Sequence, residues 1–417
     1  MFTNFKNYTT KIWNGINQLK NNHTKTYLSY ISQNNKVLKT PSEISNVFNE
    51  YYTNIAVNLD NNIPPATVDP TMFLRGNYPT SICVPPVISN DVTSVIKSLK
   101  KKKKSNTKEI PVSVLKDNCE QIAIPLSILF NQSIEQGIFP QSLKHATVIP
   151  IYKSGAKDKL GNYRPISLLS TFSKIFEKLM KKILLNFLES KSIITSEQFG
   201  FPQNLSTFHA INILSENLYS ALDSQHSLLS IFIDFSKAFD TVKHDILLQK
   251  LKHYGIRGVI YDWFKDDLSN RTQSTKILTH ISSPLNIKYG VPQGSVLGPI
   301  LFLIYINDLP QIFPRLNSVL FADDSTLYIT GENPISLIET ANTDLEILYK
   351  WCVSNRLTIN SNKTYYMLFT NKTIDALPPL KYDNSVIAKT KQHKMLGITF
   401  DEDMTFKPHI SYLSHKL

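Results

Sequence analysis

Two adjacent aspartates, Asp323 and Asp324, lie inside the apolar segment LFADDSTLY. β-Prone residues flank the pair on both sides, so we expect two short strands that meet at a turn, Asp323-Asp324-Ser325. Neighbouring carboxylates in such a segment repel each other and are costly to bury unless a cation neutralises them. Their oxygens suit Mg²⁺, which keeps water and substrate phosphates as its other ligands. Taken alone, an Asp-Asp pair is more often an ordinary turn, because aspartate hydrogen-bonds its local backbone.

Asp234 is a second carboxylate of this kind, because it ends another apolar run in SIFIDFSKAFD. Side chains alternate between the faces of a strand, so Asp323 and Asp324 need not do the same work. If the two strand ends converge, their carboxylates can hold a pair of metal ions ~3.5–4 Å apart. That arrangement serves in-line displacement at phosphorus, so the sequence predicts a metal-assisted reaction at phosphate.

Further motifs accompany these carboxylates in a definite order along the chain. They are GNYRPISLL (161–169), QFGF (198–201), YGVPQGSVLGP (289–299) and MLGITF (395–400). Together with F-x-D-F-S-K-A-F-D around Asp234 and with FADD, this order resembles the catalytic core of reverse transcriptases. The spellings are similar to those of non-LTR (LINE-type, jockey-like) retrotransposon enzymes and differ from the GDD of viral RNA polymerases. The glycines fit neither a P-loop nor a dinucleotide-binding fingerprint.

The resemblance implies an α+β fold, the right-hand polymerase fold with fingers and palm. The palm would be an RRM-like antiparallel sheet with helices. Residues 1–90 would form a helical N-terminal extension and a Pro-rich linker, and 91–225 the fingers with part of the palm. Residues 226–400 would form the palm with the catalytic carboxylates and a primer-grip-like strand, and 401–417 the start of a truncated thumb. We therefore expect a fragment of a longer retroelement protein.

The resemblance also implies a role for each matching residue near the carboxylates. Asp234 and Asp323 would ligate two Mg²⁺ ions, with Mn²⁺ as an alternative, and Asp324 would be a supporting charge or weaker ligand. Phe235 would offer its backbone carbonyl to a metal. Phe239 would lie under the incoming sugar and reject a 2′-OH, because an aromatic ring there leaves no room for that hydroxyl. Without its flanking motif, Phe239 would be taken as a core aromatic.

Other residues of these motifs match positions that hold the nucleotide. Lys153 and Arg164 would bind the triphosphate, since phosphoryl transfer depends on positioning and charge stabilisation. Gln293 and Gly294 would pack against the template base and the incoming nucleotide, and Lys363 would protonate the pyrophosphate leaving group. From the residues alone, Lys153 and Arg164 can each instead be a surface cation. Lys363 can equally be an exposed loop lysine, because a sequence does not show the geometry that a general acid requires.

Apolar periodicity predicts the elements that position these residues. A helix is expected to begin at Thr40-Pro41-Ser42, and Gly255 is expected to end another. The helices are expected at 91–104, 170–188, 245–254, 296–307 and 334–355, and the strands at 146–152, 228–234, 319–322, 326–329, 364–369 and 396–400.

The composition favours a polyanionic partner. Lys and Arg number 45 against 33 Asp and Glu, giving a formal charge of +12, as expected of a nucleic-acid-binding protein. The run Lys100–Lys104 is either a solvated basic loop or a phosphate or nuclear-targeting contact. The three separated cysteines indicate neither disulfides nor zinc. No signal peptide or segment of ~18–20 apolar residues is present, so an intracellular location, nuclear or cytoplasmic, without membrane insertion is expected.

These features together predict an RNA-directed DNA polymerase of a retrotransposon, which transfers a nucleotide from a dNTP to a primer 3′-OH. Its partners would be an RNA template, a DNA primer or nicked target DNA, and a dNTP; the sequence indicates no oligomeric state. An inactive nucleic-acid-binding remnant without its thumb is the alternative, and an RNA-dependent RNA polymerase is disfavoured by Phe239. The chain departs from the family at Pro202, where most relatives carry a basic residue, and at KKSNTKEIP (103–111), which lacks the usual Gly and Asp.

Overall fold

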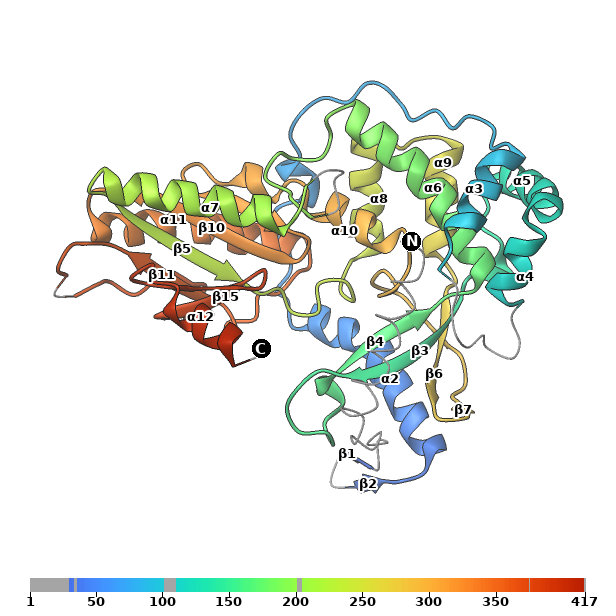
Figure 1. Cartoon of the computed structure of the whole chain (residues 1–417), viewed down its shortest axis with the longest axis horizontal. Helices are drawn as coiled ribbons and strands as arrows, with labels where there is room; N and C mark the ends of the chain where they lie inside the picture. The colour runs from blue at the N-terminus through green and yellow to red at the C-terminus, as the bar shows by residue number, and fades with distance from the viewer. Residues whose placement is uncertain (1–29, 34–35, 101–109, 201–204, 375, 416–417) are drawn as a thin grey trace, which may run out of the picture.

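The structure is a computed structural model in which two larger sheets carry the residues singled out above (Figure 1). It describes residues 30–33, 36–100, 110–200, 205–374 and 376–415. The lysine run beyond Lys100, most of the segment 103–111 and Pro202 lie outside the described residues.

The central sheet has the strand order β14-β11-β5-β10-β9. Strand β5 is antiparallel to both β10 and β11, and β10 is antiparallel to β9, whereas β14 runs parallel to β11. Strand β5 is buried along its whole length, which explains its continuous apolar sequence SLLSIFI. The strands are β5 (Ser227–Ile233), β9 (Asn317–Phe321), β10 (Asp324–Gly331), β11 (Tyr365–Phe369) and β14 (Ala388–Lys389).

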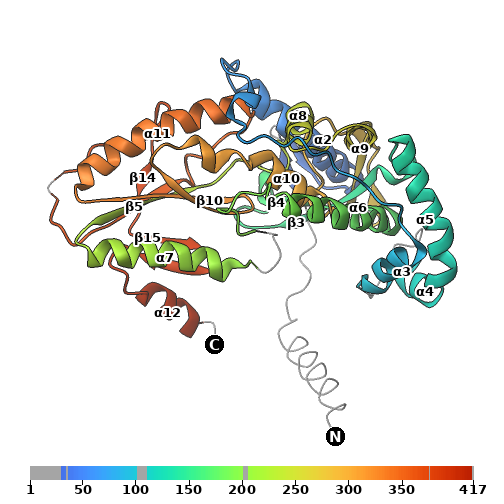
Figure 2. The ribbon, with the colours of Figure 1, turned by 90° about the horizontal axis from the view of Figure 1, so that it is seen from above.

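Two helices cover the opposite faces of this sheet, α7 (Thr207–Asp223) and α11 (Pro334–Ser354) (Figure 2). Side chains of successive β5 residues point to opposite faces of the sheet. Phe232 belongs to the apolar cluster that contains the buried residues of α7, whereas Ile231 belongs to the cluster that contains those of α11. The alternation of a strand thus joins both helices to one sheet.

The second sheet has the order β4-β3-β6-β7, with β8 also paired to β6. Strand β3 is antiparallel to β4 and parallel to β6. Helix α2 (Pro41–Asn61) packs against β6, and its buried Asn49 donates hydrogen bonds to the carbonyls of Gln273 (3.2 Å) and Ser283 (2.9 Å). The sheet therefore combines segments from both sides of residue 226. Its strands are β3 (His145–Tyr152), β4 (Tyr163–Leu168), β6 (Thr272–Ile277), β7 (His280–Ile281) and β8 (Leu285–Asn286).

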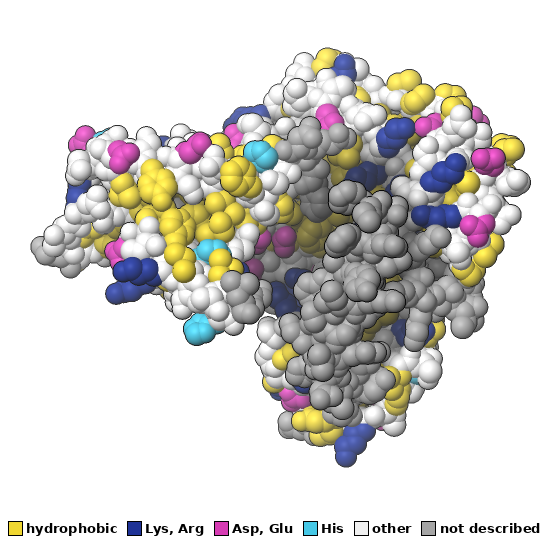
Figure 3. Space-filling view, in the orientation of Figure 1, with side chains coloured by type: hydrophobic (Ala, Val, Ile, Leu, Met, Phe, Trp, Pro, Cys, Tyr) yellow, Lys and Arg dark blue, Asp and Glu magenta, His cyan; other side chains and the backbone are white. Residues whose placement is uncertain are grey.

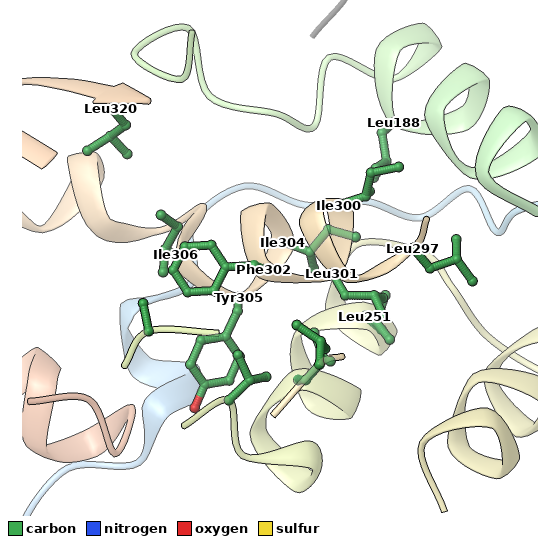
Figure 4. Packing of buried hydrophobic residues seen from close by; sticks show 14 of the residues in the cluster. Leu188, Leu251, Leu297, Ile300, Leu301, Phe302, Ile304, Tyr305, Ile306 and Leu320 are labelled. Atoms are coloured by element: carbon green, nitrogen blue, oxygen red, sulfur yellow. The ribbon is translucent and has the colours of Figure 1, made fainter. Parts of the chain in front are cut away.

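Helix α10 (Gly298–Ile306) lies at the middle of the largest apolar core and is buried on all sides. Figure 4 shows Leu188 of α6, Leu251 of α8 and Leu320 of β9 around it. A buried ion pair reinforces this packing, since Lys250 Nζ lies 2.7 Å from Asp308 Oδ1. The surrounding helices are α6 (Thr171–Ser190), α8 (His244–His253) and α9 (Val259–Leu268).

The remaining elements are short or peripheral. The helices are α3 (Ser89–Ser98), α4 (Val112–Asp117), α5 (Cys119–Gln136), α12 (Lys407–Ser414) and the 3₁₀ turns Pro70–Phe73, Gln141–Leu143, Leu160–Asn162 and Leu309–Ile312. The strands are β1 (Ile31–Gln33), β2 (Lys36–Leu38), β12 (Lys381–Tyr382), β13 (Ser385–Val386), β15 (Gln392–Met395) and β16 (Ile398–Asp401).

The α+β prediction is confirmed, and so are the predicted helices and strands, apart from small shifts of their ends and the helix expected over 91–104. Thr40 caps α2 through a reciprocal capping box with Glu43, and Gly255 follows the end of α8 with φ +94°. The helix expected over 91–104 is wrong at its end: α3 stops at Ser98, because Leu99 adopts an extended conformation. None of the helices in the described part is long and apolar enough to cross a bilayer.

Candidate active site

Asp234 and Asp323 lie at the same edge of the central sheet. Asp234 directly follows β5, and Asp323 directly precedes β10, the strand paired with β5. The turn expected at Asp323-Asp324-Ser325 is wrong by one residue: Asp324 already pairs with Phe321, so the tip consists of Ala322 and Asp323. Ala322 has φ +57°, a left-handed conformation that permits this two-residue reversal.

Every predicted site residue except Asp324 lines one pocket of about 700 Å³. Figure 3 shows acidic side chains in the hollow beside the central sheet, with Lys and Arg side chains nearby. Asp324 is exposed and lies outside this pocket. The predicted residues in its wall are Lys153, Arg164, Asp234, Phe235, Phe239, Gln293, Gly294, Asp323 and Lys363.

The carboxyl groups disfavour simultaneous ionisation. Loss of solvation raises the pKa of Asp323, and the charge of Asp234 adds to this effect, while Arg164 and Lys153 oppose it. Loss of solvation also raises the pKa of Asp324, to which the charges of Asp323 and Asp234 add. A divalent cation between the carboxylates would remove this repulsion.

The donor set fits a metal that takes only part of its ligands from protein side chains. In the described ranges, no three His, Cys, Asp or Glu side chains converge closely enough to hold an ion. Phe235 forms an antiparallel bridge with Ile359 whose hydrogen bonds run from Asn360 N to Asp234 O (2.8 Å) and from Ser236 N to Thr358 O (2.7 Å). These bonds leave the Phe235 carbonyl oxygen to point away from Ile359. Two carboxylates and a carbonyl, with water and phosphate, are the ligands that Mg²⁺ prefers.

The ring of Phe239 lies between the pocket and the apolar core. Its ring is half-buried, lines the pocket, and stacks on Phe302 of α10 with ring centres 4.6 Å apart and an interplanar angle of 30°. Phe302 is fully buried, so the core fixes the ring that forms part of the pocket wall.

Basic side chains reach the pocket from three parts of the chain. Arg164 lies on β4 opposite Ile151, and Lys153 follows β3 and donates its N–H to Asn162 O (2.9 Å). Lys363 ends a turn in which its N–H bonds to Asn360 O (3.0 Å), and Asn360 in turn bonds to Asp234.

Lys237 also lines the pocket, although the sequence reasoning missed it. Loss of solvation lowers the pKa of Lys237; the charge of Asp240 opposes this, and the like charges of Lys153, Lys363 and Arg164 add to it. The available signal was its position in F-S-K-A-F-D, three residues after Asp234. With Lys237 the wall carries a group of cations suited to a triphosphate.

The loop that carries Gln293 and Gly294 is held against β4. Ser167 donates its N–H to Gln293 O (2.7 Å). Gly294 has φ +115°, and a Cβ there would lie 2.8 Å from Ser167 O, so only glycine fits without movement.

Glu177 of α6 anchors the far end of this loop and was also missed by the sequence reasoning. Its carboxylate accepts the N–H groups of Val296 (2.5 Å) and Leu297 (3.3 Å) at the start of α10. Burial raises the pKa of Glu177 to about 7, which the charge of Arg271 opposes. No local sequence pattern indicates this contact, because 119 residues separate Glu177 from Val296.

The chain matches a family model described as reverse transcriptase (RNA-dependent DNA polymerase) over residues 151–400. It is 31% identical, over 79% of its length, to the probable RNA-directed DNA polymerase from transposon BS of Drosophila melanogaster. It is 28% identical, over 81% of its length, to the RNA-directed DNA polymerase from mobile element jockey of the same organism. The chain spans 37% and 38% of the lengths of these two relatives.

A solved structure of apo telomerase from Candida tropicalis has a TM-score of 0.43 and 14% identity, covering 69% of this chain and 60% of that one. The family match, which includes both strand-end carboxylates and most of the pocket, decides the assignment. The chain belongs to the reverse transcriptase (RNA-dependent DNA polymerase) family, as its resemblance to the non-LTR enzymes predicts.

Proposed function

We propose that this chain is the polymerase core of a retrotransposon reverse transcriptase, which copies an RNA template into DNA. One observation carries the proposal: Asp234 and Asp323 share a pocket with the cations Lys153, Arg164 and Lys363. Carboxylates that attract metal, next to cations that attract triphosphate, are the parts that nucleotidyl transfer needs.

In the proposed reaction the primer 3′-OH attacks the α-phosphorus of a dNTP, the bond between the α- and β-phosphates breaks, and pyrophosphate leaves. Asp234, Asp323 and the Phe235 carbonyl would hold two Mg²⁺ ions, with Mn²⁺ as an alternative, and Asp324 would contribute charge from outside the pocket. When bound, these ions would activate the hydroxyl and stabilise the charge that develops on the phosphates. Lys363 would hold the proton that the leaving pyrophosphate takes up.

The remaining wall residues would orient the nucleotide. Lys153 and Arg164, joined by Lys237, would hold the triphosphate. Phe239 would exclude a 2′-OH, which favours dNTP over rNTP. Gln293 and Gly294 would contact the nucleotide and the template base from the loop held by β4.

We further propose the division into an N-terminal extension (1–90), fingers with part of the palm (91–225), palm (226–400) and the start of a thumb (401–417). The proposed partners are an RNA template and a DNA primer or nicked target DNA, met in the nucleus or cytoplasm. The net charge of +12 supports a polyanionic partner.

The test is incorporation of dTTP on poly(rA)/oligo(dT) in the presence of Mg²⁺. We expect incorporation by the unaltered chain and none by Asp234→Ala, whose folding is checked by thermal melting. A signal no higher than that of Asp234→Ala would contradict the proposal. Tight, salt-sensitive RNA binding in a filter assay without incorporation would instead support the inactive remnant.

A further inference from the structure

Gln293 forms part of the wall of two separate cavities. One is the nucleotide pocket, and the other is a smaller cavity of about 40 Å³ behind it, lined also by Asp240, Arg271 and Tyr52. Asp240 lines the smaller cavity but not the nucleotide pocket. Pro165 and Pro292 also border both cavities, but among these three shared residues Gln293 is the one whose side chain can form hydrogen bonds, so it can link Asp240 to a nucleotide.

Asp240 determines which end of the Gln293 carboxamide faces the smaller cavity. Gln293 Nε2 donates to Asp240 Oδ1 at 2.8 Å. An ionised carboxylate only accepts hydrogen bonds, so the NH₂ group must face it. The carbonyl oxygen Oε1 is then the end that remains for the nucleotide pocket.

The backbone around this contact is fixed on both sides. Val291 donates its N–H to Phe239 O (2.9 Å), and Gly290 donates to Val242 O (2.7 Å). Gly290 has φ +80°, and a Cβ there would lie 2.7 Å from Asp240 O. The turn that carries Asp240 and the loop that carries Gln293 are thus in direct contact. This contact holds the two side chains next to each other.

The smaller cavity also offers donors to the carboxylate of Asp240. Tyr52 Oη and Arg271 Nη1 are buried and have no hydrogen-bond partner among the described residues. Both residues line the cavity with Asp240, and its volume has room for water that would join them.

We infer that Asp240 is a positioning residue that turns the Gln293 carbonyl oxygen toward the sugar of the incoming nucleotide. The inference rests on the proposed function. The sugar of a dNTP carries one hydroxyl, at the 3′ position, which can donate to this oxygen. Phe239, which precedes Asp240, lines the pocket where the sugar is proposed to lie. The site then favours a dNTP over a 2′,3′-dideoxynucleotide, which has no hydroxyl to donate.

Protonation of Asp240 removes this constraint, because a neutral carboxyl can either accept from Nε2 or donate to Oε1 of Gln293. Burial raises the pKa of Asp240 to about 6, while the Gln293 hydrogen bond and the charges of Lys237 and Arg164 oppose this rise. Below that pH the carboxyl can donate to Oε1, so Gln293 can turn its NH₂ group to the pocket. The preference for dNTP over ddNTP should therefore decrease as the pH is lowered through this value. The ionisable groups around Asp240 are Lys237, Arg164, Tyr51 and Tyr52, which interact with its charge, and Arg271 and Tyr289, which line the same cavity.

The experiment measures kcat and KM for dTTP and ddTTP on poly(rA)/oligo(dT), with the unaltered chain, Asp240→Asn, Gln293→Ala and the double variant. An Asn at 240 can either accept from or donate to Gln293, so both orientations of Gln293 become populated. We expect Asp240→Asn to raise the KM for dTTP about three- to tenfold, the range of one net hydrogen bond. The KM for ddTTP and both kcat values should change little. In the Gln293→Ala background the same substitution should leave the dTTP/ddTTP ratio unchanged.

Each result has a definite meaning. An unchanged ratio in Asp240→Asn, or an equal effect of that substitution with and without Gln293, overturns the inference while the proposed function stands. No incorporation by the unaltered chain contradicts the proposed function itself, and the inference with it. Thermal melting of all the variants separates a general loss of folding from the loss of dTTP selectivity, because misfolding reduces kcat for both nucleotides alike.

Discussion

Asp234 and Asp323 reach one pocket because β5 and β10 pair antiparallel, with Ile233 opposite Ser325. Neither residue is brought near the other by local sequence. We expect Asp234→Asn or Asp323→Asn to lower kcat at least ~100-fold, the scale on which a group that stabilises developing charge acts. Asp324→Asn, which alters a residue outside the pocket, should lower kcat much less. Single-turnover incorporation of dTTP measures this, and an equal loss in all three variants would contradict the ranking.

Phe239 is expected to select the sugar. Phe239→Ala removes the ring that stacks on Phe302 and should raise rNTP use relative to dNTP about 10- to 200-fold, the range for a small group in a pocket. Phe239→Tyr keeps the ring and serves as the matched control. Competition between rUTP and dTTP measures the ratio; if the ratio is the same in Phe239→Ala and Phe239→Tyr, the ring is a core residue only.

Arg164 should bind the triphosphate. A charge-assisted hydrogen bond contributes about 1.5–3 kcal/mol, so Arg164→Ala should raise the KM for dTTP roughly 10- to 150-fold. Lys159 lies in the loop that precedes β4 but outside the pocket wall, and Lys159→Ala is therefore the control. Steady-state kinetics at constant ionic strength checks the pair. Equal KM values for dTTP in the two variants would show that Arg164 contributes only general surface charge and does not bind the triphosphate.

The acidic cluster should destabilise the metal-free chain at neutral pH. Because partial loss of solvation and the charges of neighbouring carboxylates raise the pKa of Asp323 and Asp324, the folded chain binds protons more tightly than the unfolded chain. Stability is then lost as the pH rises from ~3.9 through the raised values. We expect Asp324→Asn to raise the melting temperature slightly at pH 7 without Mg²⁺. We also expect Mg²⁺ to raise the melting temperature of the unaltered chain. Thermal melting from pH 5 to 8 checks both. Stabilisation by Mg²⁺ that persists in the double variant Asp234→Asn, Asp323→Asn would place the ion elsewhere.

Gly294 should be intolerant of any side chain. Gly294→Ala places a Cβ 2.8 Å from Ser167 O in a backbone with φ +115°, and should lower the free energy of unfolding by about 1–3 kcal/mol. Gly397 has a similar φ of +100° but nothing within 4 Å of the added carbon, so Gly397→Ala isolates the effect of backbone strain. Urea unfolding measures both. A larger loss in Gly397→Ala would show that the contact with Ser167 matters little.

The sequence by itself determined the elements and the kinds of chemical group. The apolar run of β5 and the spacing of α6 and α11 are local patterns, so their predicted positions agree with the structure. The order of the motifs was enough to give the family. The strand-end aspartates could be recognised because carboxylates are unusual directly beside apolar strands.

Tertiary structure alone decided which of these groups share a site. Asp324 is adjacent to Asp323 in sequence but lies outside the pocket, because the hairpin turns one residue earlier than the pattern predicts. Asp240 meets Gln293 across 53 residues, and Glu177 meets Val296 across 119. Such contacts follow from strand pairing and helix packing, which depend on the whole chain. Hydrophobic periodicity specifies a face for each element, but it does not specify the partner that this face meets.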